Sequence, residues 1–260
     1  MSRVILLLAP SKTMDFVTPV PLAVAPQPPL FLDQATKLAA KLQKLSVKKL
    51  MKLMQVSAPI ALTVQAAYGD WQGTKAGKPA LWSYTGDVYK GVRARDLTVA
   101  DAQWAQEHLL IASGLYGLVR PYDGIQPYRL EMKAALAVGR RKNLVEFWSR
   151  TLGDYVNQQG ADWLCNCSSD EYARATLKHL KLPIVTPVFF DTKPSGVVGT
   201  VPIYSKMMRG VMARWLIDHQ VTEPDQLMAF TAHGYSYDPV RSKPGFPAFR
   251  RPKMVPLRFG

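Results

Sequence analysis

The chain has 260 residues, of which 48% are hydrophobic, 10% aromatic and 20% charged. This composition excludes intrinsic disorder over most of the length, because a disordered chain is too polar to bury enough apolar surface to offset its conformational entropy. With 33 Lys and Arg against 19 Asp and Glu, the formal net charge is +14, so we expect a basic globular protein with a sizeable core.

The first predicted element is a strand over residues 4–8, a continuous apolar run of the kind that is buried on both faces of a sheet. The run is much shorter than the roughly twenty residues that a membrane-spanning helix needs, so we expect no membrane partner. Ser11, Lys12 and Thr13 then lie at the carboxyl end of this strand. Residues 17–30 carry five prolines and should cross the surface in an extended form.

Three helices are predicted next, over residues 32–45, 47–56 and 60–68. The last two are short, are joined by a tight turn and are flanked by Lys44, Lys48, Lys49 and Lys52. This pattern is typical of a helix-hairpin-helix element, which holds a nucleic-acid backbone through main-chain amides and lysines. Its candidate phosphate contacts are Lys48, Lys49 and Lys52. The alternative is a pair of amphipathic helices with a solvated lysine face, and the absence of a Gly-x-Gly hairpin favours this alternative slightly.

In the middle of the chain we predict a strand over 81–84 and a helix from 98 to about 113. Thr98 is its expected N-cap, and Asp101 is an acid near the positive end of the helix dipole. The densest polar stretch follows over 113–132. Further on, residues 144–156 are predicted to form a helix and 161–167 a strand. Ser168 and Glu171 have capping-box spacing, which predicts a helix that starts where this strand ends.

The C-terminal part is predicted to contain a hairpin of two strands, over 183–190 and 197–204, a helix over 205–219 and a further helix that starts near residue 222. Strands and helices are mixed without strict alternation. We therefore expect a single α+β or mixed α/β domain over 1–242, a mixed sheet surrounded by helices, with 32–68 as a helix-hairpin-helix-like subdomain. Residues 243–260 should form a basic, proline-rich, extended tail.

The chain has two cysteines, Cys165 and Cys167, and a bridge between them would close a very small, strained ring. We therefore expect free thiols and a reducing compartment, by default the cytoplasm. The four histidines show neither i,i+4 spacing nor clustering near the cysteines, so no metal site is predicted.

Polar residues gather at the ends of several predicted strands, where ligand clefts form in mixed sheets. Lys12 and Arg129 could hold an anion, together with the Ser11 and Thr13 hydroxyls, and the start of the helix near Ser168 offers free amides. The candidate proton-transfer groups are Tyr89, Glu131, Asp170 and Glu171.

Each of these groups has a structural alternative. Glu171 could simply complete a capping box, and Arg129 and Glu131 could form an ion pair on one face of an extended segment. Lys12 could lay its stem along apolar surface. Arg120 is a further candidate for binding an anion or a nucleic acid, but it precedes Pro121 and could belong to a rigid turn. One polar cluster alone is therefore weak evidence of function.

Several separated motifs in this sequence resemble those of the YaaA family of peroxide stress proteins, and they occur in the family's order between about residues 4 and 238. They are PSKTMD at 10–15, GDVY at 86–89, SGLYG at 113–117 with RP at 120–121, QPYRLEM at 126–132, FW at 147–148, SDEY at 169–172, and RG at 209–210 with Met212 and Arg214.

The resemblance implies a compact mixed fold with a helix-hairpin-helix element and a basic cleft that binds DNA. It also implies a cytosolic role in limiting iron-dependent oxidative damage, without a cofactor. A basic stripe of Lys206, Arg209 and Arg214 carries over, although Met207 stands where the family usually has a lysine. Lys206 and Arg209 are three residues apart and should share one helix face.

Two functions remain open from the sequence. The first is a stress protein that binds DNA, because a +14 excess attracts phosphate polyanions through counterion release. The second is an enzyme that acts on a nucleotide, a nucleoside or a nucleic-acid base by hydrolytic or glycosidic chemistry, with Glu131 or Asp170 as general acid or base. The second hypothesis requires Lys12, Tyr89, Arg129, Glu131, Asp170 and Glu171 to meet in one pocket. The oligomeric state is left open.

Overall fold

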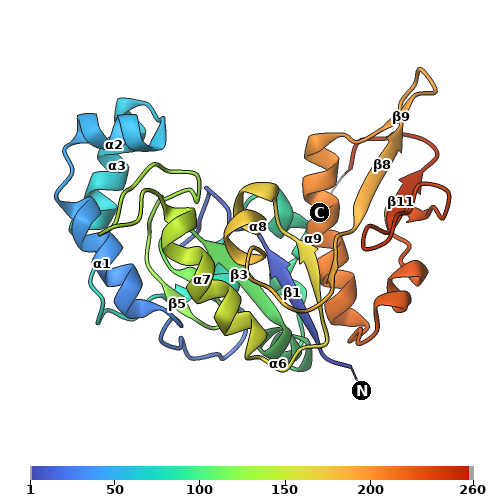
Figure 1. Cartoon of the computed structure of the whole chain (residues 1–260), viewed down its shortest axis with the longest axis horizontal. Helices are drawn as coiled ribbons and strands as arrows, with labels where there is room; N and C mark the ends of the chain where they lie inside the picture. The colour runs from blue at the N-terminus through green and yellow to red at the C-terminus, as the bar shows by residue number, and fades with distance from the viewer. Residues whose placement is uncertain (1, 258–260) are drawn as a thin grey trace.

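The apolar run near the N-terminus forms strand β1 (Val4–Leu8), the central strand of a five-stranded sheet in the computed structural model, which describes residues 2–257 (Figure 1). The strand order is β4-β3-β1-β6-β7, with β3 (Leu109–Ser113), β4 (Gly117–Val119), β6 (Trp163–Cys167) and β7 (Ile184–Val185). β1 is parallel to both neighbours, β7 is parallel to β6, and β4 is antiparallel to β3. Every residue of β1, β3 and β6 is buried, as continuous apolar runs require.

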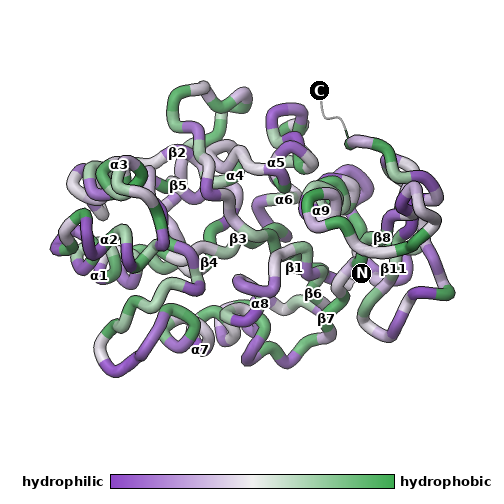
Figure 2. Tube along the Cα trace, turned by 90° about the horizontal axis from the view of Figure 1, so that it is seen from above, coloured by the Kyte–Doolittle hydropathy of each residue, from purple (hydrophilic) through white to green (hydrophobic). Residues whose placement is uncertain are grey.

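Helices cover both faces of this sheet, and the view from above separates the two layers (Figure 2). One layer contains α6 (Val99–His108) and α9 (Pro202–Asp218), which contact β1, together with α5 (Asp87–Val92) packed on α9. The other contains α7 (Leu144–Asn157) and α8 (Asp170–Thr176), which contact β4 and β3. The protein is therefore an α/β domain with a mixed sheet between helices, as the sequence predicts.

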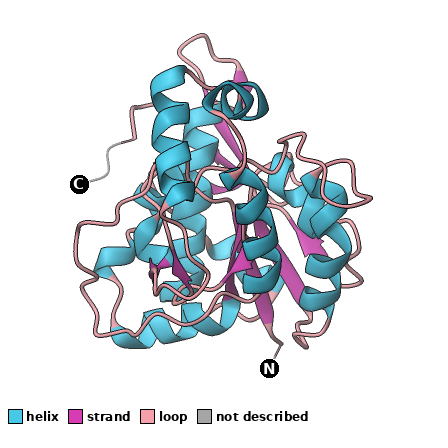
Figure 3. Cartoon of the chain, turned by 90° about the vertical axis from the view of Figure 1, so that its left-hand side faces the viewer, coloured by secondary structure: helices cyan, strands magenta, loops and turns pink. Residues whose placement is uncertain are grey.

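Three helices form one end of the molecule (Figures 1 and 3). They are α1 (Leu32–Gln43), α2 (Val47–Met54) and α3 (Ala58–Gly69), and they confirm the three helices predicted over residues 32–68. α2 and α3 pack against each other across a short turn in which Gln55 has a positive φ of 53°. Behind them, α4 (Ala80–Ser83) follows a small sheet of β2 (Lys78–Pro79) and β5 (Gly124–Ile125).

A second sheet forms the opposite end of the molecule (Figure 1). Its order is β10-β11-β8-β9, with β8 (Val188–Thr192), β9 (Val198–Gly199), β10 (Ser236–Tyr237) and β11 (Ala248–Arg251), and the 3-10 helix η2 (Pro224–Ala229) leads into it. Part of the segment expected to form a basic tail thus forms a strand here, and residues 258–260 of that segment lie outside the described residues.

A buried ion pair joins two strands of this second sheet, and its arginine also contacts α9. Arg251 of β11 stands opposite Asp191 of β8, and their side chains form an ion pair with 1% and 0% exposure. The Tyr235 hydroxyl also donates to Asp191 at 2.9 Å. The guanidinium lies over the rings of Tyr204 from α9 and Tyr235, 4.6 and 5.0 Å from their centroids. These contacts fix the N-terminal half of α9.

The helix layer of α5 and α9 depends on a very close approach of two backbones. A Cβ atom at Gly210 of α9 would lie 1.8 Å from the Val88 carbonyl oxygen of α5, and one at Gly91 of α5 would lie 2.5 Å from the Met207 carbonyl oxygen. Only glycine permits this distance, because it has no Cβ. The contact sets where α9 lies above the sheet.

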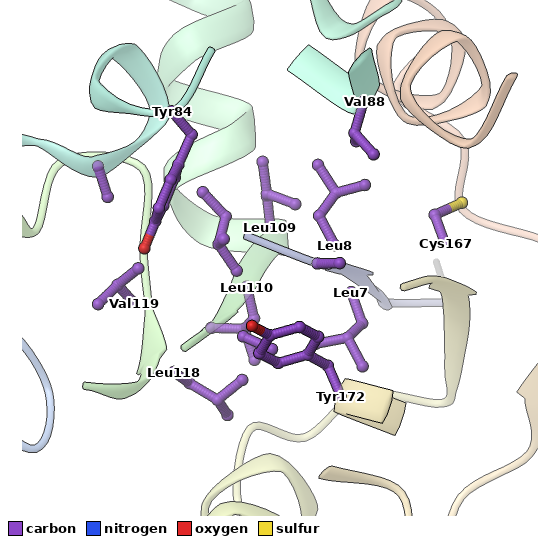
Figure 4. Close-up of a cluster of buried hydrophobic side chains, with 14 of the residues drawn as sticks. Leu7, Leu8, Tyr84, Val88, Leu109, Leu110, Leu118, Val119, Cys167 and Tyr172 are labelled. Carbon is purple, nitrogen blue, oxygen red and sulfur yellow. The ribbon is translucent and has the colours of Figure 1, made fainter. Parts of the chain in front are cut away.

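The main core lies beneath this layer. Leucine and valine side chains of β1, β3 and β4 pack between Tyr84 and Val88 on one side and Tyr172 of α8 on the other (Figure 4). These residues are all less than 9% exposed. The loops that follow β1 and β6 therefore start from a well-packed core.

Five predicted elements are wrong in type or extent. The strand expected over 183–190 is divided into β7 and β8, which belong to different sheets. Residues 80–83 form the short helix α4 rather than a strand, and the helix that opens at Thr98 ends at His108, because 109–113 form β3. The strand expected over 197–204 is limited to β9, since α9 already starts at Pro202. The helix expected near residue 222 is the 3-10 helix η2. Short apolar runs carry no periodicity that separates strand from helix.

No helix within residues 2–257 combines the length and the apolar character that crossing a bilayer requires.

Candidate functional site

A cavity of about 600 Å³ opens at the carboxyl ends of β1 and β6. After β1 the chain continues to β3 on one side, and after β6 it continues to β7 on the other. Such a switch point leaves a crevice between two adjacent parallel strands, which is where open α/β sheets bind their ligands. The topology of the sheet therefore creates this cavity.

Five segments line the cavity: the loop after β1, the start of α5, residues 128–133, the residues after β6, and α9. Its charged lining residues are Lys12, Lys90, Arg129, Lys133, Lys206 and Arg209, against Asp87, Glu131 and Glu171. Six cations against three carboxylates give the wall a positive bias. An anion would bind there more favourably than a cation.

Glu131 is the centre of the cationic wall. Its carboxylate lies 3.0 Å from Lys12 Nζ, 3.2 Å from Lys133 Nζ and 3.5 Å from an Arg129 Nη atom. The Glu131 side chain is 9% exposed, whereas those of Lys12 and Lys133 are 57% and 59% exposed. The buried carboxylate thus contacts all three cations, while the side chains of Lys12 and Lys133 remain exposed to the cavity. The cluster keeps a surplus of two positive charges.

Burial alone would raise the pKa of the Glu131 carboxyl, but hydrogen bonds and charge interactions with Lys12 and Lys133 lower it below its ordinary value. The same hydrogen bond with Glu131, helped by the charge of Glu171, raises the pKa of Lys133. Glu131 is therefore ionised at neutral pH. It can accept a proton or a hydrogen bond but cannot serve as a resting general acid.

A pH-dependent loss of stability follows for Glu131→Gln. A carboxyl whose pKa is lowered on folding stabilises the folded state above its unfolded pKa of about 4.3, and that contribution disappears as the pH falls through the folded value. We expect the difference in unfolding free energy between wild type and Glu131→Gln to be complete at pH 7 and to decrease steadily as the pH falls below about 4.3. Urea unfolding at pH 7, 5, 4 and 3 measures it.

Asp154→Asn is a suitable control for that series, because the Asp154 side chain is 55% exposed and forms only a surface ion pair. Its unfolding free energy should stay close to that of wild type at each pH. A stability difference for Glu131→Gln that is equally large at pH 7 and pH 3 would contradict the assigned role of the three cations.

The tyrosines that line the cavity are held by internal hydrogen bonds. The Tyr89 hydroxyl donates to the Ala9 carbonyl at 3.0 Å, and Tyr128 shares hydrogen bonds with Tyr84 and Ser113 at 2.8 and 2.7 Å. Burial raises the pKa of Tyr128 to about 12 and also raises the pKa of Tyr89. Both phenols stay protonated at neutral pH, so neither acts as a base there.

The loop after β1 is fixed against the start of α5. Ser11 Oγ and Thr13 Oγ1 are 3.0 Å apart, and the Thr13 amide donates to Ser11 Oγ. A Cβ atom at Gly86 would lie 2.2 Å from Ser11 Oγ, so a larger residue here would displace the Ser11 hydroxyl from its present position. The contact brings the hydroxyls of the first loop beside the amino end of α5.

Two smaller cavities adjoin the first one. A cavity of about 430 Å³ lies between α2 and residues 131–136; it shares Glu131 and Lys133 with the first cavity and is also lined by Lys49 and Lys52. A third, of about 270 Å³, lies against α3 and shares Lys12 and Arg129. Cations from α2 to α9 therefore line adjoining hollows, which meet at residues 129–133.

Most of the predicted site residues do come together. The first cavity contains Ser11, Lys12, Thr13, Tyr89, Arg129, Glu131, Glu171, Lys206 and Arg209. Asp170 is exposed and does not line it, although the pocket hypothesis included this residue. Lys49 and Lys52 line the second cavity, and Lys48 lines none of the three.

Two predicted anion-binding arginines have structural contacts instead. Arg120 pairs with the buried carboxylate of Asp123 at 2.8 Å, which fits the rigid turn considered from the sequence. Arg214 pairs with Asp218 at 2.6 Å and donates to the Arg93 carbonyl. Neither lines any of the three cavities.

The capping box expected for Ser168 and Glu171 does not form. The Ser168 hydroxyl donates to Asn166, the N-cap of α8 is Ser169, and Glu171 accepts from the Lys133 amide at 3.1 Å. Lys133 was missed in the sequence, although its spacing of two from Glu131 places it on the same face of an extended segment. Lys90, which forms an i,i+3 ion pair with Asp87 on α5, was missed as well.

Within residues 2–257, no group of three or more His, Cys, Asp and Glu side chains is arranged to hold a metal ion. Cys165 and Cys167 are free, buried strand residues with their sulfur atoms 3.9 Å apart. The hydrogen bond between them and their burial raise the pKa of the Cys165 thiol, which makes it a poor nucleophile.

The comparisons with known proteins agree on one family. The family model described as peroxide stress protein YaaA matches residues 4–241. A UPF0246 protein of Verminephrobacter eiseniae is 40% identical over 255 residues, which cover 95% of this chain and 98% of the relative. One from Shewanella oneidensis is 42% identical over 255 residues with the same coverage, and one from Burkholderia multivorans is 39% identical over 257 residues.

Proposed function

The chain belongs to the YaaA family of peroxide stress proteins, and from this premise we propose that it binds DNA and limits iron-dependent oxidative damage in the cytoplasm. The DNA lies in the basic cleft, which we define as the first and second cavities joined at Glu131 and Lys133. Its cations are Lys12, Lys49, Lys52, Lys90, Arg129, Lys133, Lys206 and Arg209.

One observation carries this proposal: cations from α2 and from α9 flank the same segment, residues 129–133. Lys49, Lys52 and Lys206 are exposed on the two flanks. A polynucleotide presents a regular row of phosphates, and lysines and arginines that neutralise them release counterions and so drive binding. Cations on both sides of one cleft match such a row better than they match a single small anion.

The α2–α3 pair supports the same proposal as a helix-hairpin-helix-like contact. Neither Ser46 nor Ser57 caps its helix through the side chain, so first-turn amides of α2 and α3 remain available to a phosphate. Lys49 and Lys52 lie on α2 beside the second cavity. Amides and lysines together are the groups that this class of element offers to a nucleic-acid backbone.

Charge reversal on α9 tests the proposal. We expect Lys206→Glu combined with Arg209→Glu to weaken duplex DNA binding at least tenfold at low salt, because two attractive charges become repulsive. Fluorescence anisotropy with a labelled duplex measures the affinity. Lys178→Glu with Lys181→Glu is the matched control, since it makes the same charge change at exposed lysines outside the three cavities. Equal losses in both double variants would refute the cleft as the binding surface.

An enzyme that acts on a nucleotide, a nucleoside or a nucleic-acid base is the second candidate. Glu131 and Glu171 in the first cavity favour it, because backbone binding needs cations and has no use for carboxylates. An ionised Glu131 could act as a general base in hydrolytic or glycosidic chemistry. Release of free base or phosphate from nucleotides and DNA, present in wild type and lost in Glu131→Gln, would support this activity.

A further inference from the structure

The first cavity has a size that DNA binding alone does not require. About 600 Å³ lies within the range of roughly 300–1,000 Å³ that encloses one small organic molecule. A double helix cannot enter such a space, and phosphates along a cleft need only its rim. The cavity nevertheless continues down to the carboxyl ends of β1 and β6, between α5 and α8.

The wall of the cavity divides into an apolar floor and a charged rim. Val88, Tyr89, Tyr128, Leu130 and Tyr172 form much of the floor and are each at most 8% exposed. The rim carries Lys12 and Lys133, whose side chains are more than half exposed. A ligand that joins a flat, apolar-faced ring to a phosphate matches this wall, because the ring favours the apolar floor and the phosphate favours the charged rim.

Two polar groups at this wall could recognise the edge of such a ring. The ionised Glu131 carboxylate is a buried acceptor. Arg129 Nε is a buried donor with no hydrogen-bond partner among the described residues, and the nearest contact of that guanidinium to Glu131 is 3.5 Å. A buried donor without a partner is costly, so a ligand that accepts its hydrogen bond gains affinity. An acceptor and a donor side by side match the polar edge of a nucleobase.

We propose that the first cavity takes a single nucleotide that has turned out of DNA held in the basic cleft, with its base on the floor and its phosphates at the rim. The inference rests on the proposed function, and it adds that the protein recognises a single nucleotide of the bound DNA. Turning a base out of the stack costs least at a mismatched or damaged base, so the site favours irregular DNA.

A duplex that contains 2-aminopurine opposite a mismatched base tests this inference, because 2-aminopurine fluoresces more strongly when it is unstacked. We expect its fluorescence to rise severalfold when wild-type protein is added. Thr85→Trp fills the cavity from an exposed residue and should abolish the rise even at protein concentrations at which anisotropy shows the duplex to be fully bound. Thr85→Val is the matched control without added bulk. Ser169→Trp, from another wall, should repeat the result.

Binding of deoxynucleoside monophosphates, measured by calorimetry, is the second readout. We expect wild type and Thr85→Val to bind them and Thr85→Trp to lose at least tenfold in affinity. DNA binding without a fluorescence rise and without mononucleotide binding would overturn the inference and leave the proposed function intact. Mononucleotide binding without DNA binding would overturn both the proposed function and the inference that the nucleotide comes from bound DNA.

Discussion

Replacing Arg251 with methionine lowers the free energy of unfolding by about 3–5 kcal/mol, the usual cost of removing one partner from a buried ion pair. Asp191 would remain as a buried charge with only the Tyr235 hydroxyl as a hydrogen-bond partner. The guanidinium would also vanish from between the rings of Tyr204 and Tyr235. Chemical denaturation monitored by circular dichroism measures the change.

Two further variants distinguish the loss of this buried ion pair from the loss of an arginine on the protein surface. Arg250→Met, on the same strand, should cost less than about 1 kcal/mol, because the Arg250 side chain is 40% exposed. Combining Arg251→Met with Asp191→Asn should recover much of the lost stability, since no buried charge is left. If Arg250→Met and Arg251→Met were equally destabilising, the buried pair would not hold β11 to β8.

Gly210→Ala is expected to destabilise the protein by about 3 kcal/mol, at the upper end of the cost of overpacking. The added methyl would lie 1.8 Å from the Val88 carbonyl oxygen, and a backbone oxygen cannot move aside as the tip of a flexible side chain can. α5 and α9 would have to separate, and α9 carries Lys206 and Arg209. We therefore expect DNA affinity to fall as well, at temperatures where the variant is still folded.

Gly199→Ala provides the control for Gly210→Ala, because nothing lies within 4 Å of a Cβ atom at Gly199. Thermal unfolding of the two variants should differ clearly, with Gly199→Ala close to wild type. Equal melting temperatures for all three proteins would show that the α5–α9 contact is looser than the structure indicates.

The elements with a strong local signal were predictable from the sequence. The buried strand at 4–8 and the start of a helix at Thr98 appear where the sequence predicts them, and the helix predicted over 32–45 spans 32–43. Residues 109–113 were misassigned, because a strand buried on both faces has no alternation and here directly follows a helix. Pairing of β11 with β8 depends on contacts 60 residues apart, which no local pattern reveals.

The site was partly predictable for a similar reason. Polar residues after β1 and β6 could be expected at one edge of the sheet, because the ends of neighbouring parallel strands lie together. Lys12, Glu131 and Glu171 do share the first cavity. Arg120 and Arg214 do not, because nearby aspartates and carbonyls take their guanidinium groups, and the sequence does not show which partner an arginine has.

The cluster around Glu131 connects the fold with its proposed activity. The carboxylate fixes three cations at the junction of the two cavities, so they need little ordering when a phosphate arrives. Gly86, Gly91 and Gly210 bring α5, α9 and the loop after β1 close enough to complete the wall. The cationic cleft and the nucleotide-sized hollow then form one continuous surface, to which the proposed DNA binding is assigned.

The salt dependence of DNA affinity tests that surface most directly. For each phosphate that a protein cation neutralises, the slope of log affinity against log salt concentration changes by about 0.9. We predict that Lys206→Ala combined with Arg209→Ala makes the slope shallower by about 1.8 than in wild type, because two phosphate contacts are lost. An unchanged slope in this double variant would contradict the claim that DNA lies in the basic cleft against α9.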